Sequence, residues 1–380
     1  MITTIERPFW LTRIHEAWRR RSIVWLSGVR RAGKTTIARM LPGSVYMNCD
    51  LPSAVRALED PELFLRDQSP EAVLVFDEVH RLDDPSRLLK IAADEYPRLK
   101  ILATGSSTLA ATRKFRDSLA GRKHSIHLCP VLWEECGDPF GAPELDRRLL
   151  HGGLPEPLLA VGKDPEFFSE WIDSFYARDI MELFDIRNRQ GFLALFRLLL
   201  RQSGGQLDYS RLASSAELSR ATVKSHIAAM QVAHAIRLLR PYHRGGKREI
   251  VSRPKCYAFD TGFVTFEKGW DAIRDDDRGL LWEHLVLDSL CARFNESDTF
   301  YWQDKSRREV DFVIRHSRDR VDAVECKINP ERLDAAPVGA FRRHHPSGEN
   351  IVISPAVSKP YKFHRRGLVF TACNTSDYPL

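Results

Sequence analysis

A glycine-rich turn between an apolar strand and a helix constrains the fold of this chain more than any other feature. Residues 22–41 read SIVWLSGVRRAGKTTIARML, in which an apolar run precedes the spacing GxxxxGK[ST]. In such a turn, backbone N–H groups close around phosphates, the lysine reaches the β- and γ-phosphates, and the hydroxyl ligates magnesium. The segment therefore predicts an α/β P-loop fold that binds ATP and Mg²⁺. The predicted nucleotide ligands are Gly28, Ala32, Gly33, Lys34, Thr35 and Thr36.

Two further apolar runs end in polar residues that suit the same chemistry. Residues 71–80 read EAVLVFDEVH, an apolar strand followed by an acidic pair. We expect Asp77 to hold Mg²⁺, directly or through water, and Glu78 to polarise the attacking water. Residues 99–107 read LKILATGSS, a third buried strand. Thr104 and Ser106 are both candidates for orienting the hydrolytic water near the γ-phosphate.

An arginine near the end of a predicted helix indicates a partner subunit. Residues 114–128 read KFRDSLAGRKHSIHL, in which Arg122 follows a glycine just before the next strand. An arginine placed there can reach the γ-phosphate of a neighbouring subunit, which is arginine-finger chemistry. Arg113 and Arg116 are weaker candidates. The alternative is a surface arginine at a helix end, where a cation is favoured by the helix dipole.

Charge is distributed unevenly along the chain. The net charge of the 380 residues is +6, but residues 186–265 alone contain 14 Lys and Arg against 4 Asp and Glu, a net charge of +10. A basic segment between two nearly neutral ones is typical of a surface that binds a polyanion. The alternative is a solvated basic face without a partner.

The same composition argues against a membrane protein or a secreted one. No apolar run reaches the roughly 18 residues that a membrane helix needs. The N-terminal MITTIERPFW lacks the basic and apolar regions of a secretory signal. The 7 cysteines are scattered, with no CxxC spacing, which favours reduced thiols and a cytoplasmic location.

The basic segment has helix-turn-helix proportions followed by a candidate wing. In YSRLASSAELSRATVKSHIAAM, Val223, Ile227 and Met230 fall on one apolar face of the second helix. A hairpin with Gly245 and Gly246 at its tip would form the wing. We expect contacts to DNA phosphates rather than to base edges, and therefore little sequence specificity. Winged helices also bind proteins, which is the alternative. The predicted DNA-binding residues are Arg220, Lys224, Lys247 and Arg248.

Near the C-terminus, EVDFVIRHSRDRVDAVECKINP places acids on two neighbouring strands. Because side chains alternate along a strand, Glu325 and Lys327 point to one face, and a hairpin brings Asp311 beside them. The preceding helix carries Glu283. The predicted order of one helix, three strands, a helix and a strand is that of the PD-(D/E)XK nuclease core. These carboxylates could hold a divalent metal, with Lys327 activating water. The alternative is a domain of this fold that holds DNA without cutting it.

The motifs GVRRAGKTT, LVFDE, LATGSS, SLAGR and HGGLPEP occur in an order that resembles the bacterial and archaeal AAA-type ATPases with a C-terminal domain of unknown function. The resemblance covers nearly the whole chain. It implies a helical lid over the nucleotide that opens at Gly152–Pro155, and a nuclease-like core at the C-terminus with acids at Glu283, Asp311 and Glu325. Two positions depart from the family: Val29 stands where a proline is frequent, and Gln303 where an arginine is common, which would weaken a phosphate contact.

Together these features predict four parts: a P-loop ATPase core at 1–144, a helical lid at 145–188, a winged-helix domain at 189–265 and a PD-(D/E)XK nuclease-like domain at 266–380. By analogy with the resembling family, we expect a homo-oligomeric, ring-forming ATPase that processes branched or recombining DNA. Two alternatives stay open. One is a metal-dependent nuclease licensed by ATP, and the other is a nucleotide-regulated DNA-binding switch without motor activity.

Overall fold

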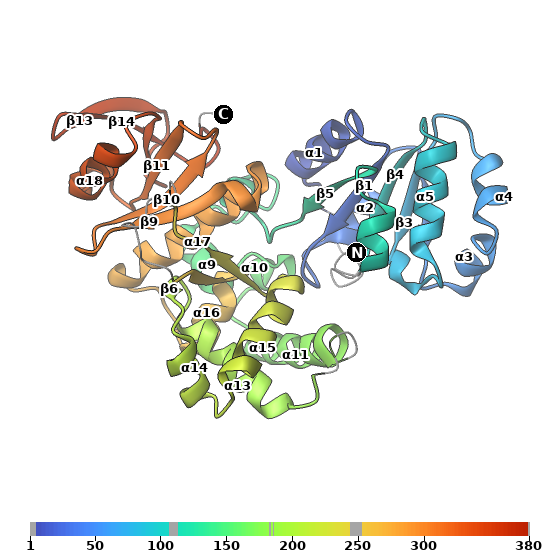
Figure 1. Ribbon diagram of the computed structural model, residues 1–380, viewed down its shortest axis with the longest axis horizontal. Coiled ribbons are helices and arrows are strands. Elements are labelled where there is room, and N and C mark those ends of the chain that lie inside the picture. The colour runs from blue at the N-terminus through green and yellow to red at the C-terminus, as the bar shows by residue number, and fades with distance from the viewer. Residues whose placement is uncertain (1–4, 106–112, 182–183, 185, 244–252, 379–380) are drawn as a thin grey trace. The chain divides into compact units, whose positions relative to one another are not determined.

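The computed structural model describes residues 5–105, 113–181, 184, 186–243 and 253–378 of the chain. The chain divides into two compact units (Figure 1). The first unit comprises Met1–Cys129, Ile172–Arg187 and Val232–Ala235, and the second comprises Pro130–Trp171, Asn188–Gln231 and Ile236–Leu380.

The first unit is built on a parallel sheet of five strands in the order β2-β3-β4-β1-β5. Every residue of the interior strand β1 is buried, which explains its unbroken apolar run. Because the strands are parallel, the carboxyl ends of β1, β3 and β4 lie at one edge, where open α/β sheets bind ligands. The strands are β1 (Ile23–Ser27), β2 (Val45–Asn48), β3 (Val73–Asp77), β4 (Lys100–Thr104) and β5 (Lys123–His127).

Short helices accompany this sheet, and several begin with a proline or a capping aspartate. The Asp60 side chain caps α4 and the Asp84 side chain caps α5 by accepting backbone N–H groups. In the core beneath them, Trp25 meets Phe115 edge to face at 4.9 Å between ring centroids. The helices are α1 (Pro8–Trp18), α2 (Lys34–Arg39), α3 (Pro52–Ala57), α4 (Pro61–Arg66), α5 (Pro85–Glu95) and α7 (Arg113–Ser118), with a 3-10 turn η1 (Val79–Arg81). The last part of α11 (Pro165–Phe175) and the π-helix η2 (Tyr176–Met181) also belong to this unit.

The second unit contains a helical region and a small antiparallel sheet in the order β6-β8-β7. In α15, Val223, Ile227 and Met230 are buried, as the predicted apolar face requires. The helices are α8 (Trp133–Gly137), α9 (Leu145–His151), α10 (Pro155–Leu159), α13 (Arg189–Arg201), α14 (Tyr209–Ser215), α15 (Arg220–Val232) and α16 (Thr261–Glu267). The strands are β6 (Gly205–Gln206), β7 (Ile236–Leu239) and β8 (Lys255–Ala258).

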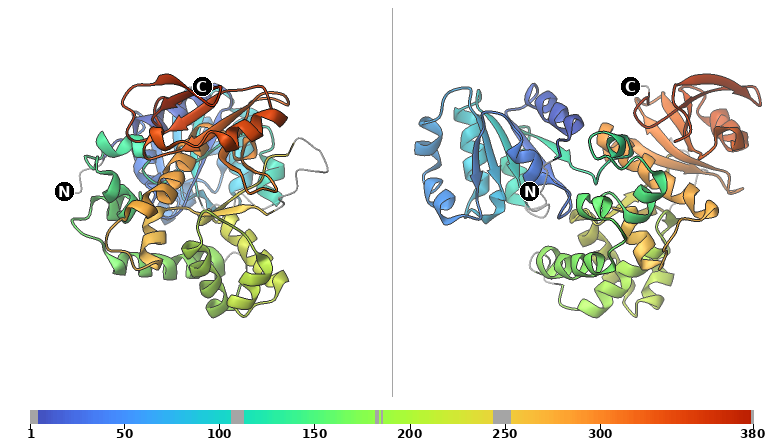
Figure 2. Two further views of the ribbon diagram at one scale, coloured as in Figure 1. Left: turned by 90° about the vertical axis from the view of Figure 1, so that its left-hand side faces the viewer. Right: turned by 180° about the vertical axis from the view of Figure 1, so that it is seen from behind.

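The C-terminal part of the second unit, coloured orange to red in Figure 2, contains a mixed sheet of six strands. The strand order is β13-β14-β12-β11-β10-β9. Its strands β9, β10 and β11 run antiparallel, whereas β11, β12 and β14 run parallel. Helix α17 (Asp275–Arg293) contacts β11, and α18 (Ala336–His344) contacts β10. The strands are β9 (Thr299–Gln303), β10 (Glu309–Arg315), β11 (Val321–Cys326), β12 (Asn350–Ile353), β13 (Tyr361–Arg365) and β14 (Leu368–Cys373), and the 3-10 turns are η3 (Glu296–Asp298) and η4 (Pro330–Arg332).

The P-loop α/β architecture of the first unit agrees with the prediction. The four predicted parts form a finer division than the two units. The N-terminal segment of the first unit ends at Cys129, and residues of the predicted lid belong to both units. That four-part division stays a prediction. All seven cysteines are free thiols. Within the described residues, no helix is long and apolar enough to cross a membrane.

Candidate nucleotide site and carboxylate cluster

The turn between β1 and α2 has the backbone conformation that its glycines permit. Gly28 and Gly33 have φ values of 148° and 100°, in the region that favours glycine. A Cβ atom on Gly28 would lie 2.6 Å from the Leu128 carbonyl oxygen, so a larger residue would clash there. The Lys34 ammonium donates to the Gly28 and Val29 carbonyl oxygens at 2.8 and 3.0 Å. Burial lowers the pKa of Lys34. The lysine is therefore held over the turn where phosphates would bind.

Asp77 ends β3 as a buried carboxylate held by two hydroxyl groups. Tyr46 donates to its Oδ2 atom at 2.6 Å, and Thr104 donates to its Oδ1 atom at 2.5 Å. The Thr104 oxygen also accepts the backbone N–H of Glu78 at 3.0 Å. Thr104 therefore ties the carboxyl ends of β3 and β4 together. A carboxylate has about four lone-pair positions, so Asp77 retains capacity for Mg²⁺ or a metal-bound water.

Glu78 follows in a backbone conformation that is rare for a residue other than glycine. Its φ and ψ angles are 56° and 42°, in the left-handed region. Its Oε2 atom lies 3.2 Å from Nδ1 of His80. The hydrogen bond with His80, and next to it the charge of Lys34, hold the pKa of Glu78 below its usual value. Glu78 is thus an ionised carboxylate beside the P-loop, which suits the predicted role of polarising water.

Asp179, on the π-helix η2, is a neighbour of this site that the sequence interpretation missed. Its Oδ2 atom lies 3.9 Å from the Arg30 guanidinium. Burial raises the pKa of Asp179 to about 6, and the charges of Arg30 and Lys34 oppose that rise. The signal was present, because Asp179 continues the apolar face that carries Phe175 four residues earlier. An acid on an apolar helical face needs a partner, and here the partners come from the P-loop.

Among the other predicted members of this site, Arg122 forms an ion pair within its own chain. Its Nε and Nη2 atoms donate to the Asp94 carboxylate at 2.6 and 3.1 Å. Ser106 lies outside the described residues, so the structure does not test its predicted role. Thr104, the other candidate for orienting water, donates to Asp77 and accepts the Glu78 backbone N–H. Its role toward water stays a prediction.

The arginine-finger role of Arg122 can be tested by mixing subunits. We expect the Arg122→Ala protein and the Lys34→Ala protein each to lose hydrolysis when assayed separately, and a 1:1 mixture to recover it at about a quarter of all subunit interfaces. Phosphate release by the mixture is the measurement. A mixture of Lys34→Ala protein with the Lys34→Ala/Arg122→Ala double variant is the control, because it has no intact pair. Absence of recovery in assemblies of normal size would contradict a finger acting in trans.

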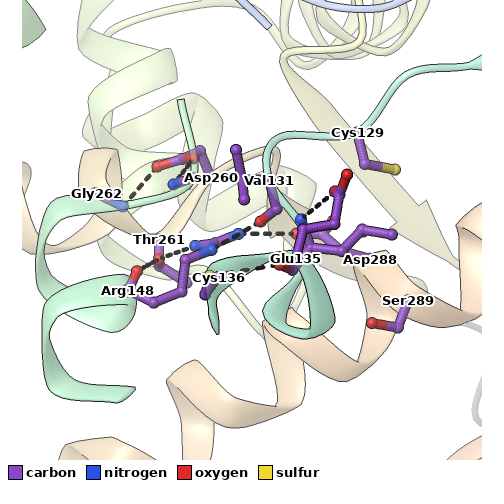
Figure 3. Close-up of polar contacts among 12 residues, drawn as sticks. Cys129, Val131, Glu135, Cys136, Arg148, Asp260, Thr261, Gly262, Asp288 and Ser289 are labelled. Carbon is purple, nitrogen blue, oxygen red and sulfur yellow. Dashed lines mark hydrogen bonds and ion pairs between the residues drawn. The ribbon is translucent and has the colours of Figure 1, made fainter. Parts of the chain in front are cut away.

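Arg148 and Asp260 belong to a buried polar network in the second unit (Figure 3), and the Gly152–Gly153 turn packs against it. The Gly153 N–H donates to Oδ2 of Asp260 at 2.6 Å, and a Cβ atom on Gly152 would lie only 1.9 Å from the Asp260 Oδ1 atom. Arg148, with a fully buried side chain, donates to the Val131 carbonyl at 2.9 Å and to Thr261 Oγ1 at 3.2 Å. Gly152 is thus required by close packing against Asp260, and Gly153 by close packing against the Arg148 guanidinium.

The predicted DNA-binding residues are only partly described. Arg220 and Lys224 are exposed near the start of α15. The Lys224 ammonium lies 5.8 Å from the centroid of the Tyr209 ring. Lys247 and Arg248 lie outside the described residues.

The four predicted members of the C-terminal site lie in one cluster of charges. Lys327 Nζ lies 3.2 Å from Asp311 Oδ2 and 2.8 Å from Glu325 Oε2. Glu283, on α17, accepts a short hydrogen bond from the Tyr257 hydroxyl. Burial, reinforced by the Asp311 charge, raises the pKa of Glu283 to about 7 and that of Glu325 to about 8. Over the described ranges, no group of three or more His, Cys, Asp or Glu residues is placed to hold a metal ion. The metal role of these residues stays a prediction.

Comparison with known families matches three successive parts of the chain. Residues 20–137 match an AAA domain, residues 142–273 a domain of unknown function (DUF8612), and residues 278–367 another domain of unknown function (DUF4143). The N-terminal part is therefore an AAA-type P-loop ATPase domain, as predicted. The other two families carry no assigned function, so the winged-helix and nuclease-like interpretations stay predictions.

Similar proteins and structures are distant. An uncharacterized protein of Mycobacterium tuberculosis is 29% identical over 327 residues, covering 82% of this chain and 72% of the relative. An uncharacterized protein of Methanocaldococcus jannaschii is 23% identical over 320 residues, covering 76% of this chain and 70% of the relative. Among solved structures, a Walker-type ATPase of Pyrococcus abyssi aligns with a TM-score of 0.44 and 16% identity, over 70% of this chain and 96% of that one. A RuvB variant of Thermotoga maritima aligns with a TM-score of 0.30 and 16% identity, over 62% of this chain and 90% of that one.

Proposed function

We propose that this protein is an oligomeric ATPase that couples Mg²⁺-dependent ATP hydrolysis to the movement or remodelling of DNA. The observation that carries the hydrolytic half is the meeting of Lys34, Asp77 and Glu78 at one edge of a parallel sheet. Branched or recombining DNA is the substrate class that the family resemblance implies, and a ring is the proposed assembly.

Each of the three side chains has a distinct part in the proposed hydrolysis. Lys34 would bind the β- and γ-phosphates, after leaving the carbonyl oxygens that it now contacts. Asp77, together with the Thr35 hydroxyl, would hold Mg²⁺, which neutralises charge on the phosphates. Glu78, ionised and next to the metal-binding acid, would orient the attacking water and take its proton. Bound water is thus activated by the chain's own carboxylate.

The DNA-binding half of the proposal rests on the basic segment. The elements α13, α14 and α15 followed by β7 and β8 have the order of a winged helix, and α15 presents Arg220 and Lys224 on its exposed side. A net charge of +10 over residues 186–265 supports binding to phosphates. We further propose that the C-terminal sheet is a nuclease-derived fold that helps to hold DNA.

An ATPase assay with four DNA conditions tests this function against its alternatives. Phosphate release is measured without DNA and with linear, forked and four-way DNA, and the products are examined for strand displacement and for nicks. We expect stimulation by DNA, greatest with branched DNA, and displacement without cutting. If DNA stimulates phosphate release and the products contain nicks that disappear in the Asp311→Ala variant, the protein is the ATP-licensed nuclease. ATP-dependent DNA binding without stimulation or displacement would indicate the regulatory switch.

Salt dependence tests whether α15 grips the DNA backbone. For each duplex phosphate that the protein no longer neutralises, the log–log slope of affinity against salt should become shallower by about 0.9. We therefore expect Arg220→Ala/Lys224→Ala to reduce the slope by about two units and to weaken binding to all duplex sequences alike. Fluorescence anisotropy over a range of salt concentrations is the measurement.

A matched control for that experiment removes the same charge elsewhere. Arg87 and Lys90 are exposed on α5 of the first unit, and their double replacement by alanine should leave the slope close to that of the wild type. If the α15 variant keeps both the affinity and the slope, DNA does not contact this helix. The helix would then be a candidate for subunit contacts.

A further inference from the structure

A second lysine, from outside the predicted nuclease core, enters the C-terminal carboxylate cluster. Lys255 lies on β8 of the small sheet, whereas the acids come from α17 and the large sheet. Its Nζ atom is 3.2 Å from Glu283 Oε1 and 2.5 Å from Glu309 Oε1. It also lies 5.4 Å from the centroid of the Tyr301 ring. Lys255 therefore brings an ammonium group among the acids that the fold would use for a metal.

Burial separates Lys255 from any role at the protein surface. Its side chain is only 6% exposed, compared with 26% for Lys327. A lysine this buried cannot reach a phosphate of bound DNA without leaving its partners. The charges of Glu283 and Glu309 outweigh the effect of burial and raise the pKa of Lys255, so it stays protonated. Its position makes it a counterion for the cluster.

The oxygens around Lys255 do not fit a metal site. Mg²⁺ needs several oxygen ligands in near-octahedral geometry at about 2.0–2.1 Å. Here Glu283 Oε1 receives the Tyr257 hydroxyl as well as Lys255, and Asp311 Oδ2 receives the Cys326 N–H at 2.8 Å and Lys327 at 3.2 Å. In the described part of the chain, no three metal-binding side chains are placed to share an ion. A divalent cation bound to the same carboxylates would lie close to the Lys255 ammonium group, and the two positive charges would repel each other.

We propose that Lys255 is the resident cation of this cluster. Its ammonium group takes the place of the divalent metal expected for a PD-(D/E)XK core, so the domain keeps the nuclease-type arrangement of strands without binding a metal. The four acids around the two lysines are Glu283, Glu309, Asp311 and Glu325.

One atom of the cluster shows what removal of Lys255 would release. Glu325 is 3% exposed, and its Oε1 atom is buried without a hydrogen-bond partner among the described residues. Without the Lys255 ammonium group, Glu283 would also lack the cation with which it is paired. The cluster would then contain more uncompensated carboxylate oxygens, which are the preferred ligands of hard divalent cations.

The test is Mn²⁺ binding by the full-length, nucleotide-free protein, followed through the electron paramagnetic resonance signal of free Mn²⁺. Lys255→Met removes the charge at similar length, and Lys255→Arg keeps it. We expect Lys255→Met to gain one bound Mn²⁺ per chain relative to the wild type, and Lys255→Arg to gain none. Adding Asp311→Asn to Lys255→Met should abolish the gain, which assigns the ion to this cluster. In the wild type, Asp311→Asn should leave Mn²⁺ binding unchanged.

Two results would overturn the proposal. One is Mn²⁺ bound by the wild type and lost in Asp311→Asn, because the cluster would then hold a metal beside Lys255. The other is a Lys255→Met protein with a wild-type circular dichroism spectrum and no added Mn²⁺. If Lys255→Met fails to fold, Lys255→Gln replaces it in the same comparison, and the wild-type arm decides independently of both variants. Neither arm depends on ATP hydrolysis or DNA binding, so failure here is distinct from failure of the proposed function.

Discussion

Replacing Glu78 with glutamine is expected to lower the ATP turnover number by about 10²–10⁴-fold while leaving ATP bound. Glutamine keeps the size of the side chain but cannot accept a proton from water. The pKa of Glu78 is lowered, chiefly by its hydrogen bond with His80 and then by the charge of Lys34, so the native group is an ionised carboxylate at neutral pH. Single-turnover phosphate release and equilibrium binding of ATP measure the two quantities separately.

A matched variant distinguishes this effect from a general loss of charge. Glu71 precedes the same strand β3 and is exposed, so Glu71→Gln should turn over ATP like the wild type. Lys34→Ala should instead lose nucleotide binding, because it removes the main cation for the β- and γ-phosphates. Unchanged turnover in Glu78→Gln would remove Glu78 from the water-activating role. Loss of ATP binding in that variant would assign it to nucleotide affinity instead.

The candidate nucleotide site could be located from the sequence because its residues lie on short contiguous segments. The spacing from Gly28 to Thr35 determines a turn, and the Asp77–Glu78 pair directly ends a buried strand. Parallel strands then place these ends at one edge with no further information. The apolar face of α15 was predictable for the same reason, since residues at helical spacing must share a side.

Several partners that are distant in the sequence could not be predicted. Asp179 reaches the P-loop from a segment more than a hundred residues later, and Tyr46 binds Asp77 from the neighbouring strand. Lys255 enters the carboxylate cluster from a different sheet. A periodic pattern shows which face of an element is buried, but not which element covers it. An unpaired acid on an apolar face signals only that some partner exists.

Arg122 illustrates the same limit for a surface residue. The sequence shows that Arg122 follows Gly121, but its ion pair with Asp94 on α5 depends on how two helices pack. A finger acting in trans must exchange this intramolecular ion pair for a phosphate. Exposed ion pairs of this kind contribute little to stability, so the exchange is energetically accessible.

The second large effect is expected at Arg148, in the network drawn in Figure 3. Replacing it with methionine should lower the free energy of unfolding by about 3–5 kcal/mol, because a buried charge partner is removed from two acids. The Arg148 Nη2 atom lies 3.8 Å from Oδ2 of Asp288, and its charge also stabilises the ionised form of Asp260, which is 2% exposed. Urea unfolding followed by tryptophan fluorescence measures the loss.

The adjacent arginine provides the control, and pH provides a signature that packing alone would not give. Arg147 is only half-buried and donates to the carbonyls of Leu158 and Ala160, so Arg147→Met should cost less, about 1–2 kcal/mol. Burial raises the pKa of Asp288 in the folded state to about 6, above its unfolded value, so protonation below that pH favours the fold. A protonated acid no longer needs a cation. The deficit of Arg148→Met should therefore be greatest above about pH 6 and shrink as pH falls through this value. A deficit that is equal at pH 5 and pH 8 would show that Arg148 acts through packing and its carbonyl contacts, and not as the counterion of these acids.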